Sequence, residues 1–534
     1  MLDNLHDGHL ELWRLNYGVI TLIPKVKPAM TVKQFRPVCL LNVIYKIITK
    51  TLTIRLTSVI EEIISPFQTA FIPGRNILEG VVILQEVLHE LRMFKQAGVI
   101  LKLDFEKAYD KVDWNFLEEV LKRKGFSETW IHWINQAVRG GRVCIDMNGM
   151  RGEFFRSFKG LRQGDPLSPL LFNLVADALS AMLTRAASAG LIQGLVPYLV
   201  AGGITHLQYA DDTILLLQFS VENLTNIRRI LACYETMSGM KINFDKSEVF
   251  TVGLSVEDQQ QAALILGCKA GSFPMTYLGM PVSFCKISKN QLRYVSDKAE
   301  KRLSTWQCDY LSIGGRSILI ESCLSSIPMY TMRVYELCEG NYQLLDLIRS
   351  RFYWQGTGKK RKYHMVKWEA LSRPKEFGGL GFLDVRVINI CLLAKWIAKL
   401  ETGDSSLCCS LLRQKYLGQK SIYQLRRKTG SQFWRSLLGM RDWFQRGRKI
   451  EIKAGVQTRF WLDCWLGECP LKVSFFKLFQ IASDQNLEVS KACVQGQWEI
   501  SFRRQLDDSQ RQEWAELLEI LNEVQLTEGV DKMV

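Results

Sequence analysis

Apolar positions in the first 282 residues follow two different periods, which predict alternating strands and helices. Runs rich in β-branched and aromatic residues at 17–23 and 99–105 predict buried strands. Apolar side chains recur at helical spacing in five other segments, 43–64, 77–94, 114–124, 169–187 and 221–238. This order of segments predicts a mixed α+β region.

Shorter patterns complete that region. They predict a hairpin of 143–148 and 154–158 across residues 149–152, strands at 204–209 and 213–219, a short strand near 241–244, and extended structure at 277–282. Beyond about residue 284 the pattern becomes mostly helical and basic. We therefore expect an N-terminal α+β part and a helical C-terminal part.

Three carboxylates lie at the ends of predicted strands. Asp104 stands near the end of the strand at 99–105, and Asp211 and Asp212 connect the strands at 204–209 and 213–219. Hard divalent cations prefer oxygen ligands, and a two-metal centre for phosphoryl transfer needs bridging carboxylates. The alternative is that Asp211 and Asp212 only form a turn, because Asp is a favoured turn residue.

Charge is unevenly distributed along the chain. The 534 residues carry a formal net charge of +15, with 47% hydrophobic and 23% charged residues, which indicates a globular protein of several domains and excludes a disordered or collagen-like chain. Residues 359–453 contain 22 Lys and Arg but only 7 Asp and Glu, so this window alone equals the excess of the whole chain. The charge suggests an anionic partner.

Cysteine spacing and hydropathy indicate the kind of protein and its cellular compartment. The fourteen cysteines lie singly apart from Cys408 and Cys409, without CxxC spacing, which favours reduced thiols in an intracellular protein and predicts no zinc finger. The uncharged run at 186–210 is interrupted by polar residues, Pro197 and glycines. We therefore expect no membrane span there and no secretory signal.

Read in order, eight stretches resemble the reverse transcriptases of LINE-type (non-long-terminal-repeat) retrotransposons. These are YGVITLIPK (17–25), FRPVCLLN (35–42), QTAFIPGRNILEG (68–80), KLDFEKAYDKVDW (102–114), GLRQGDPLSPLLFNL (160–174), YADD (209–212), SGMKINFDKSE (238–248) and YLGMPV (277–282). Their order distinguishes them from a chance YADD tetrapeptide. Segments at 306–332 and 352–400 also resemble the part that follows the polymerase in plant LINE-type elements.

The resemblance implies an α+β right-hand polymerase fold with fingers, palm and thumb. We expect fingers and palm in residues 1–283, a thumb-like helical region in 284–350, and a basic C-terminal region in 351–534 that stops before a zinc-binding segment. Aromatic residues interleave with the cations of 359–453, which suits phosphate neutralisation and base stacking. The alternative is a helical domain whose aromatics form its core.

The resemblance also implies an activity. The chain would be an RNA-directed DNA polymerase in which Asp104, Asp211 and Asp212 bind two Mg²⁺ ions and a primer 3′-hydroxyl is extended on an RNA template. Its partners would be the RNA template, a DNA primer or target DNA, and deoxynucleoside triphosphates. The alternative is a catalytically silent, retroelement-derived protein that binds nucleic acid.

Further site residues follow from the same resemblance. The nucleotide would contact Lys25, Arg36, Tyr109, Gln163 and Gly164, with Lys246 as a proton donor to pyrophosphate and Tyr277, Leu278 and Gly279 as the primer grip. Tyr109 would exclude a 2′-hydroxyl and so select deoxynucleotides. Other interpretations stay open: Tyr109 as a core residue, Gly164 as part of a turn, and the cations as solvated surface charges.

Overall fold

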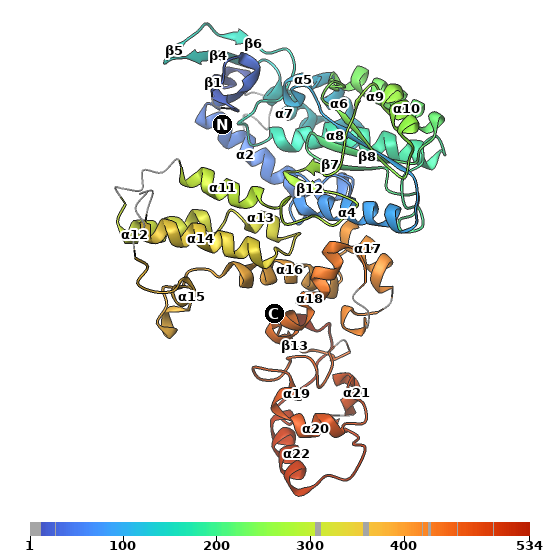
Figure 1. Cartoon of the computed structure of the whole chain (residues 1–534). Coiled ribbons are helices and arrows are strands. Elements are labelled where there is room, and N and C mark those ends of the chain that lie inside the picture. The colour runs from blue at the N-terminus through green and yellow to red at the C-terminus, as the bar shows by residue number, and fades with distance from the viewer. Residues whose placement is uncertain are drawn as a thin grey trace. The chain divides into compact units, whose positions relative to one another are not determined.

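The computed structural model describes residues 12–26, 28–304, 311–355, 363–418, 420–425, 429–456, 458–494 and 496–533. Its contacts divide the chain into two units (Figure 1). Unit 1 holds Met1–Ser288 with Ser405–Tyr416, and unit 2 holds Lys289–Asp404 with Leu417–Val534. The predicted boundaries at residues 283 and 350 stay predictions.

The first sheet of unit 1 joins strands that lie far apart in the chain. β1 (Tyr17–Pro24) pairs antiparallel with β2 (Phe35–Leu41) and parallel with β4 (Arg142–Met147). β5 (Met150–Arg151) and β6 (Phe155–Arg156) both pair with β4. The predicted turn at 149–152 was wrong. The chain reverses at Asn148 and Gly149, whose φ angles of 55° and 81° suit the tight turn that Asn-Gly favours.

The second sheet lies at the centre of unit 1. Its strand order is β10 (Lys269–Ala270), β9 (Glu248–Val252), β3 (Gly98–Leu103), β8 (Asp212–Leu217) and β7 (His206–Tyr209). The predicted strand at 241–244 was wrong: Ile242 makes only a single bridge to Phe105, and Asn243 begins a turn that accepts N–H groups of Lys246 and Ser247. The paired strand β9 follows that turn.

Helices cover the central sheet. Val99, Leu101 and Leu103 of β3 pack in one core with residues of α8 (Ser168–Ser188) and α9 (Val221–Ser238), while α4 (Ile77–Met93) contacts β7 and β9. Side chains alternate along a strand, so buried strands supply apolar residues to both faces. α8 is long and apolar enough to cross a membrane, but 67% of its apolar window is buried inside the protein, as in a core helix.

The other helices before residue 288 are shorter than α4, α8 and α9. They are α2 (Val43–Thr57), α3 (Ile60–Ile63), α5 (Ala108–Lys111), α6 (Trp114–Arg123), α7 (Glu128–Val138) and α10 (Val256–Leu266). Of these, α2, α6, α7 and α10 have a side-chain N-cap. The predicted single helix at 43–64 is interrupted at Ser58 and Val59, and α7 was not predicted. Asp113 caps α6 by accepting the N–H groups of Asn115 and Phe116.

A late segment of the chain belongs to unit 1. α17 (Leu407–Leu412) contacts α4, and Lys415 behind it lies with its Nζ atom 3.0 Å from Glu86 Oε2 and 2.7 Å from Glu90 Oε2. The Tyr416 hydroxyl donates to Glu86 Oε2 at 2.6 Å. All three charged side chains are at least 90% buried. A lysine of the basic window therefore serves as a buried counter-ion.

Unit 2 is mainly helical. Its first helices are α11 (Tyr294–Leu303), α12 (Ile313–Leu319), α13 (Met329–Met332), α14 (Glu339–Gln355), α15 (Trp368–Leu371), α16 (Val385–Glu401) and α18 (Gln432–Gly447). Four short helices follow: α19 (Leu471–Ser474), α20 (Phe476–Ile481), α21 (Val489–Ala492) and α22 (Asp508–Leu521). The paired two-residue strands are β13 (Ile450–Glu451) with β16 (Lys532–Met533), and β14 (Cys493–Val494) with β15 (Gln497–Trp498). Phe460, Trp461 and Trp465 help form the second core of this unit.

Buried His206 makes unit 1 sensitive to acid. Its Nε2 lies 2.7 Å from the Ser180 hydroxyl and its Nδ1 2.8 Å from that of Thr205, and burial lowers the pKa of His206 to about 3. The unfolded chain binds a proton below a pH of about 6.5, and the folded chain does not until about pH 3. The free energy of unfolding therefore has its full value above about pH 6.5 and decreases as the pH falls towards 3. The loss at pH 5 is roughly 2 kcal/mol.

Urea unfolding at pH 7.5 and pH 5 measures this loss. His206→Gln should reduce the difference between the free energies of unfolding at pH 7.5 and pH 5. The control His132→Gln, at a histidine of α7, should leave that difference unchanged. An equal loss in native chain and His206→Gln would assign the acid sensitivity to other groups.

Candidate active site

The central sheet brings two of the predicted carboxylates to facing positions. Leu103 of β3 pairs with Thr213 of β8 in an antiparallel register, so the next positions, Asp104 and Asp212, stand opposite each other. Tyr209 of β7 pairs with Asp212 from the other side. Asp212 is thus the first residue of a strand, and the hairpin loop consists of Ala210 and Asp211 alone.

Electrostatic repulsion accompanies this arrangement. Desolvation, and then the charge of Asp104, raise the pKa of Asp211; desolvation, and then the charge of Asp211, raise the pKa of Asp212. Desolvation by neighbouring groups and like charges both disfavour the ionised form. A divalent cation would relieve both effects, so the donor set suits a hard metal ion.

The side chains of Asp104, Asp211 and Asp212 are not arranged as a metal-binding group. Within the part of the chain that the structure describes, no three His, Cys, Asp or Glu side chains are grouped to hold a metal ion. The strand register brings the backbone of Asp104, Asp211 and Asp212 together, and their side chains would have to converge on an ion. Their assignment as metal ligands stays a prediction.

Gln68 supports the carboxylate hairpin from behind and was not predicted as a site residue. Its fully buried side chain accepts the N–H groups of Ala210 and Ala70, each at 3.0 Å through Oε1. Ala210 has a φ of 53°, in the left-handed region. Backbone bonds from Thr69 to Gln208 and from Gln208 to Phe67 hold the same two segments together. Gln68 therefore stabilises the turn that presents Asp211.

We expect Gln68→Met to slow catalysis with little effect on binding. The variant keeps the side chain's length but frees the Ala210 N–H, and a shift of about 1 Å in a reacting group can cost about 10²-fold in rate. Single-turnover primer extension, the activity that the sequence resemblance implies, measures the rate. The matched control is Thr69→Val, which loses a 3.3 Å hydrogen bond to Gln208 but leaves Ala210 bound. Equal rates in the two variants would contradict a positioning role.

Tyr109 lies near the carboxylates as a fixed ring. It stacks on Phe172 with ring centroids 4.5 Å apart and an angle of 8° between the planes. Burial, and then the charge of Asp211, raise the pKa of the Tyr109 hydroxyl, so it stays protonated at neutral pH. Tyr109 is half-buried and packs against the core, so both interpretations of this residue, core contact and gate, are compatible with its position.

Two predicted phosphate-binding cations lie on the first sheet. Arg36 of β2 is exposed, pairs in register with Ile23, and its charge lowers the pKa of Asp211. Lys25 follows β1. Burial raises the pKa of Asp110, and the charges of Lys107 and Lys25 oppose part of this rise. Arg36 and Asp211 are therefore close enough to interact electrostatically across the two sheets.

Gln163 and Gly164 join the loop before α8 to β2. The Gln163 carbonyl accepts the Cys39 N–H at 2.8 Å, and Gly164 has a φ of 112°. A Cβ atom at Gly164 would lie 2.6 Å from the Cys39 carbonyl oxygen. The glycine is therefore required by close approach to the backbone of β2, whichever ligand it also contacts. Asp165 caps the following turn by accepting from Leu167 N–H and the Ser168 hydroxyl.

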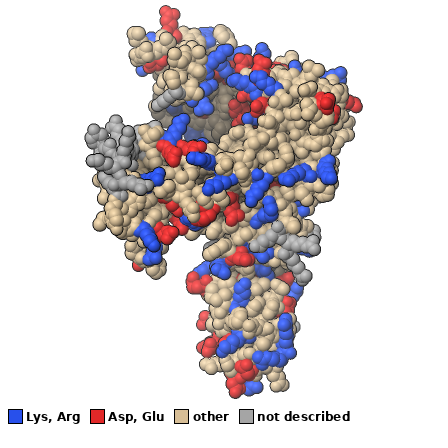
Figure 2. All heavy atoms as spheres, in the orientation of Figure 1, with Lys and Arg blue, Asp and Glu red and all other residues tan. Residues whose placement is uncertain are grey.

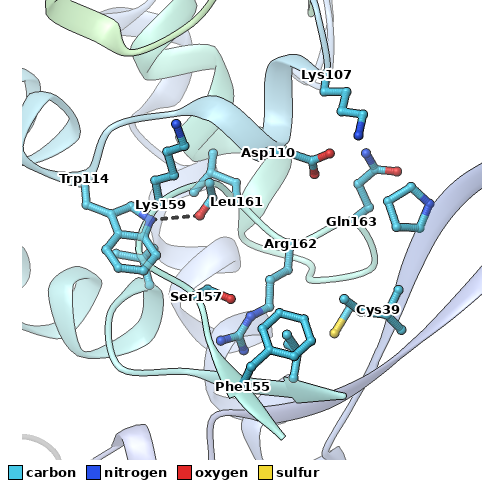
Figure 3. A pocket seen from close by; sticks show the side chains of 15 residues that line it. Cys39, Lys107, Asp110, Trp114, Phe155, Ser157, Lys159, Leu161, Arg162 and Gln163 are labelled. Carbon is cyan, nitrogen blue, oxygen red and sulfur yellow. Dashed lines mark hydrogen bonds between the residues drawn. The ribbon is translucent and has the colours of Figure 1, made fainter. Parts of the chain in front are cut away.

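A cavity of about 450 Å³ opens beside this loop (Figure 3). Gln163 lines it together with Lys107, Asp110, Lys159 and Arg162, and Trp114 and Phe155 contribute aromatic walls. Lys107, Asp110 and Gln163 lie at one side of the cavity, with Arg162 and Phe155 at another (Figure 3). Cationic groups next to apolar walls suit a ligand that combines phosphates with a planar ring.

Lys246 and the predicted primer grip lie on other elements. Lys246 is exposed in the turn after Ile242, where the Asn243 N–H donates to the Asp104 carbonyl at 2.7 Å. β11 (Met275–Tyr277) and β12 (Met280–Val282) form a hairpin around Leu278 and Gly279, with φ angles of 48° and 76°. Tyr277 is buried against Gly80 of α4. Their roles toward substrate stay predictions.

The sequence of this chain is similar to one protein family and to several known proteins. The family described as reverse transcriptase (RNA-dependent DNA polymerase) matches residues 23–282. An uncharacterised 149 kDa protein of transposon TX1 from Xenopus laevis is 28% identical over 381 residues, covering 69% of this chain and 27% of that protein. A retrovirus-related Pol polyprotein from the type-2 retrotransposable element R2DM of Drosophila melanogaster is 28% identical over 244 residues, covering 46% of this chain and 22% of that protein.

A solved structure is also similar. Apo telomerase from Candida tropicalis superposes with a TM-score of 0.38 at 12% identity, covering 75% of this chain and 69% of that one. The chain spans about a quarter of the length of the two curated relatives.

Proposed function

We propose that this chain is an RNA-directed DNA polymerase of a plant LINE-type retrotransposon. It extends a primer 3′-hydroxyl on an RNA template with deoxynucleoside triphosphates. The proposal starts from the match of residues 23–282 to the reverse transcriptase family. The observation that carries the proposal is the register of β3 and β8, which sets Asp104 opposite Asp212 beside Asp211 at the hairpin loop. The scattered single cysteines favour an intracellular location, in the nucleus or the cytoplasm.

Asp104, Asp211 and Asp212 would hold two Mg²⁺ ions. When bound, such ions stabilise charge on the reacting phosphate and on the attacking and leaving oxygens. The chain's contribution is to hold carboxylates at a strand end whose turn is stabilised by Gln68. Because desolvation, and then like charges, raise the pKa of Asp211 and Asp212, a bound cation would stabilise their ionised forms.

The other residues bind and orient the nucleotide. The Arg36 guanidinium and Lys25 ammonium would hold triphosphate oxygens, and Gln163 would contact the nucleotide at the edge of the 450 Å³ cavity. Lys246 would donate a proton to pyrophosphate, and Tyr277, Leu278 and Gly279 would hold the primer end. The sugar would rest against Tyr109, whose ring is fixed by Phe172.

Replacing Tyr109 tests sugar selection. Tyr109→Ala should raise incorporation of ribonucleotides relative to deoxynucleotides by about 10-fold or more, because the ring that meets a 2′-hydroxyl is gone. Tyr109→Phe keeps the ring and its stack on Phe172, and should keep selection near the native value. Competition between labelled rNTPs and dNTPs measures the ratio. Unchanged selectivity in the alanine variant would leave Tyr109 as a core residue only.

Primer extension tests the activity itself. Purified full chain is given an RNA template, an annealed DNA primer, dNTPs and Mg²⁺, and the product is followed on a gel. Extension that requires both the template and Mg²⁺ supports the proposal. Template binding without any extension would instead favour a silent nucleic-acid-binding protein derived from a retroelement.

A further inference from the structure

The basic window contains both core aromatics and exposed ones, among them Tyr363, Phe377 and Trp443. On α18, Phe433 and Trp434 are buried at 0% and 1% exposure, and Phe433 meets Trp396 of α16 edge to face at 5.4 Å. Trp443 on the same helix is 56% exposed, and Arg446 lies with its Cζ atom 5.5 Å from the Trp443 ring centroid. Most of these aromatics therefore serve the core, whereas Trp443 does not.

Trp443 belongs to one exposed ridge of α18. Arg435, Gly439, Trp443 and Arg446 are all exposed, and a Cβ atom added to Gly439 would meet nothing within 4 Å. Positions 435 and 446 are eleven residues apart, which corresponds to about 16 Å along a helix. The acidic residue on this stretch of helix is Asp442, and it pairs with Arg441 at 3.4 Å.

α19 adds a cation, Lys472, to the end of the ridge. Gln445 of α18 donates to the Leu462 carbonyl at 2.8 Å, and the Lys472 N–H donates to the Trp461 carbonyl at 2.9 Å, so the segment that leads into α19 is joined to α18. Arg459 pairs with buried Asp463, its Nη2 atom lying 2.5 Å from Oδ1, and Asp463 also pairs with Arg448. Among the described residues, no carboxylate lies within ion-pair distance of Lys472.

Lys472 lies among charges of both signs. Burial, and then the charge of Arg459, lower the pKa of Lys472; Asp442 and Asp463 oppose this shift, and Arg446 adds the smallest effect. Because none of the described carboxylates pairs with its ammonium group, Lys472 can contact a phosphate.

We propose that Trp443, with Arg435, Arg446 and Lys472, forms a binding site for single-stranded nucleic acid on unit 2. One base stacks on Trp443, and the flanking phosphates contact the arginines and the lysine. A nucleic acid fits better than an acidic peptide because the site pairs cations with a flat exposed ring. The site lies outside the reverse transcriptase match at 23–282 and does not depend on the carboxylate chemistry.

Photocrosslinking locates the contact directly. Full chain is irradiated with a 12-nucleotide single strand containing 5-bromouridine, and the adducts are mapped by mass spectrometry. We expect an adduct at Trp443 that disappears with excess unlabelled strand. If unit 2 yields no adduct on α18 while unit 1 is labelled, the proposed site is wrong even though the polymerase domain binds nucleic acid.

Binding to the unlabelled strand supplies the second measurement. By fluorescence anisotropy, Trp443→Ala should weaken affinity about 10-fold, and Arg446→Gln with Lys472→Gln should reduce the slope of log affinity against log salt by about 0.7 for each cation removed. Trp443→Phe should retain most affinity, and Arg503→Gln, at an exposed arginine elsewhere in unit 2, should change neither quantity. Equal effects of the Arg503 and Arg446 variants, or equal binding of polyglutamate, would overturn the proposal.

Discussion

Asp212→Asn should reduce primer extension by about 10²–10³-fold while making the folded chain more stable. The substitution keeps the shape of the side chain but removes one of the charges that would hold the metal ions, and the loss of one such stabilising group costs on the order of 10²–10³ in rate. Asp104→Asn and Asp211→Asn should lose primer extension to a similar degree, because Asp104 faces Asp212 across β3 and β8 and Asp211 is its neighbour in the chain.

The opposite effect on stability follows from the pKa shifts. Although the Asp212 side chain is exposed, desolvation by neighbouring groups and the charges of Asp211 and Asp104 raise its pKa, so its ionised form is less stable in the folded chain than in the unfolded one. At neutral pH the carboxylate therefore opposes folding, and a neutral amide removes that opposition. The difference should fade as the pH falls and the native carboxylate takes up its proton.

Two measurements on the same preparations distinguish function from folding. Thermal unfolding without metal at pH 7 should show a higher midpoint for Asp212→Asn, and single-turnover extension should show the lost rate. Asp245→Asn, at an exposed aspartate in the nearby turn, is the matched control and should extend primers normally. Lost activity together with a lowered midpoint would mean that Asp212 is needed for folding instead.

Lys415→Met should destabilise unit 1 by about 3–5 kcal/mol. Removing one partner of a buried ion pair leaves its charge without compensation, and here two carboxylates, Glu86 and Glu90, share the lysine. Tyr416 still donates one hydrogen bond to Glu86, which satisfies only part of that charge. Segment 405–416 should therefore leave α4, and the helix itself should open more readily.

Hydrogen exchange and urea unfolding measure this result. Amides of α4 and of Ser405–Tyr416 should exchange faster in Lys415→Met, and a triple variant with Glu86→Gln and Glu90→Gln should recover much of the lost stability. Lys420→Met, at an exposed lysine nearby, is the control. A change below about 1 kcal/mol, as at a surface ion pair, would refute the importance of this buried cluster.

The success and failure of individual predictions have physical causes. Long helices such as α4, α8 and α9 were predicted to within a few residues because their apolar spacing is a local property of the chain. β9 was missed because its pairing with β3 depends on a partner about 150 residues away. The turn at Asn148 and Gly149 was misplaced, although Asn-Gly is itself a strong local signal for a two-residue turn.

The sequence by itself determined the long helices, the eight resembling stretches and the acidic residues at strand ends, because helical periodicity and motif order are properties of consecutive positions. Only the tertiary structure decided which side chains meet. In the folded chain Asp104 lies opposite Asp212, and Gln68 accepts a hydrogen bond from Ala210. Lys415 is a buried counter-ion and not a surface cation. The tertiary structure also separated Trp443 from the core aromatics. These outcomes depend on strand register, helix rotation and burial, which contacts between distant segments select.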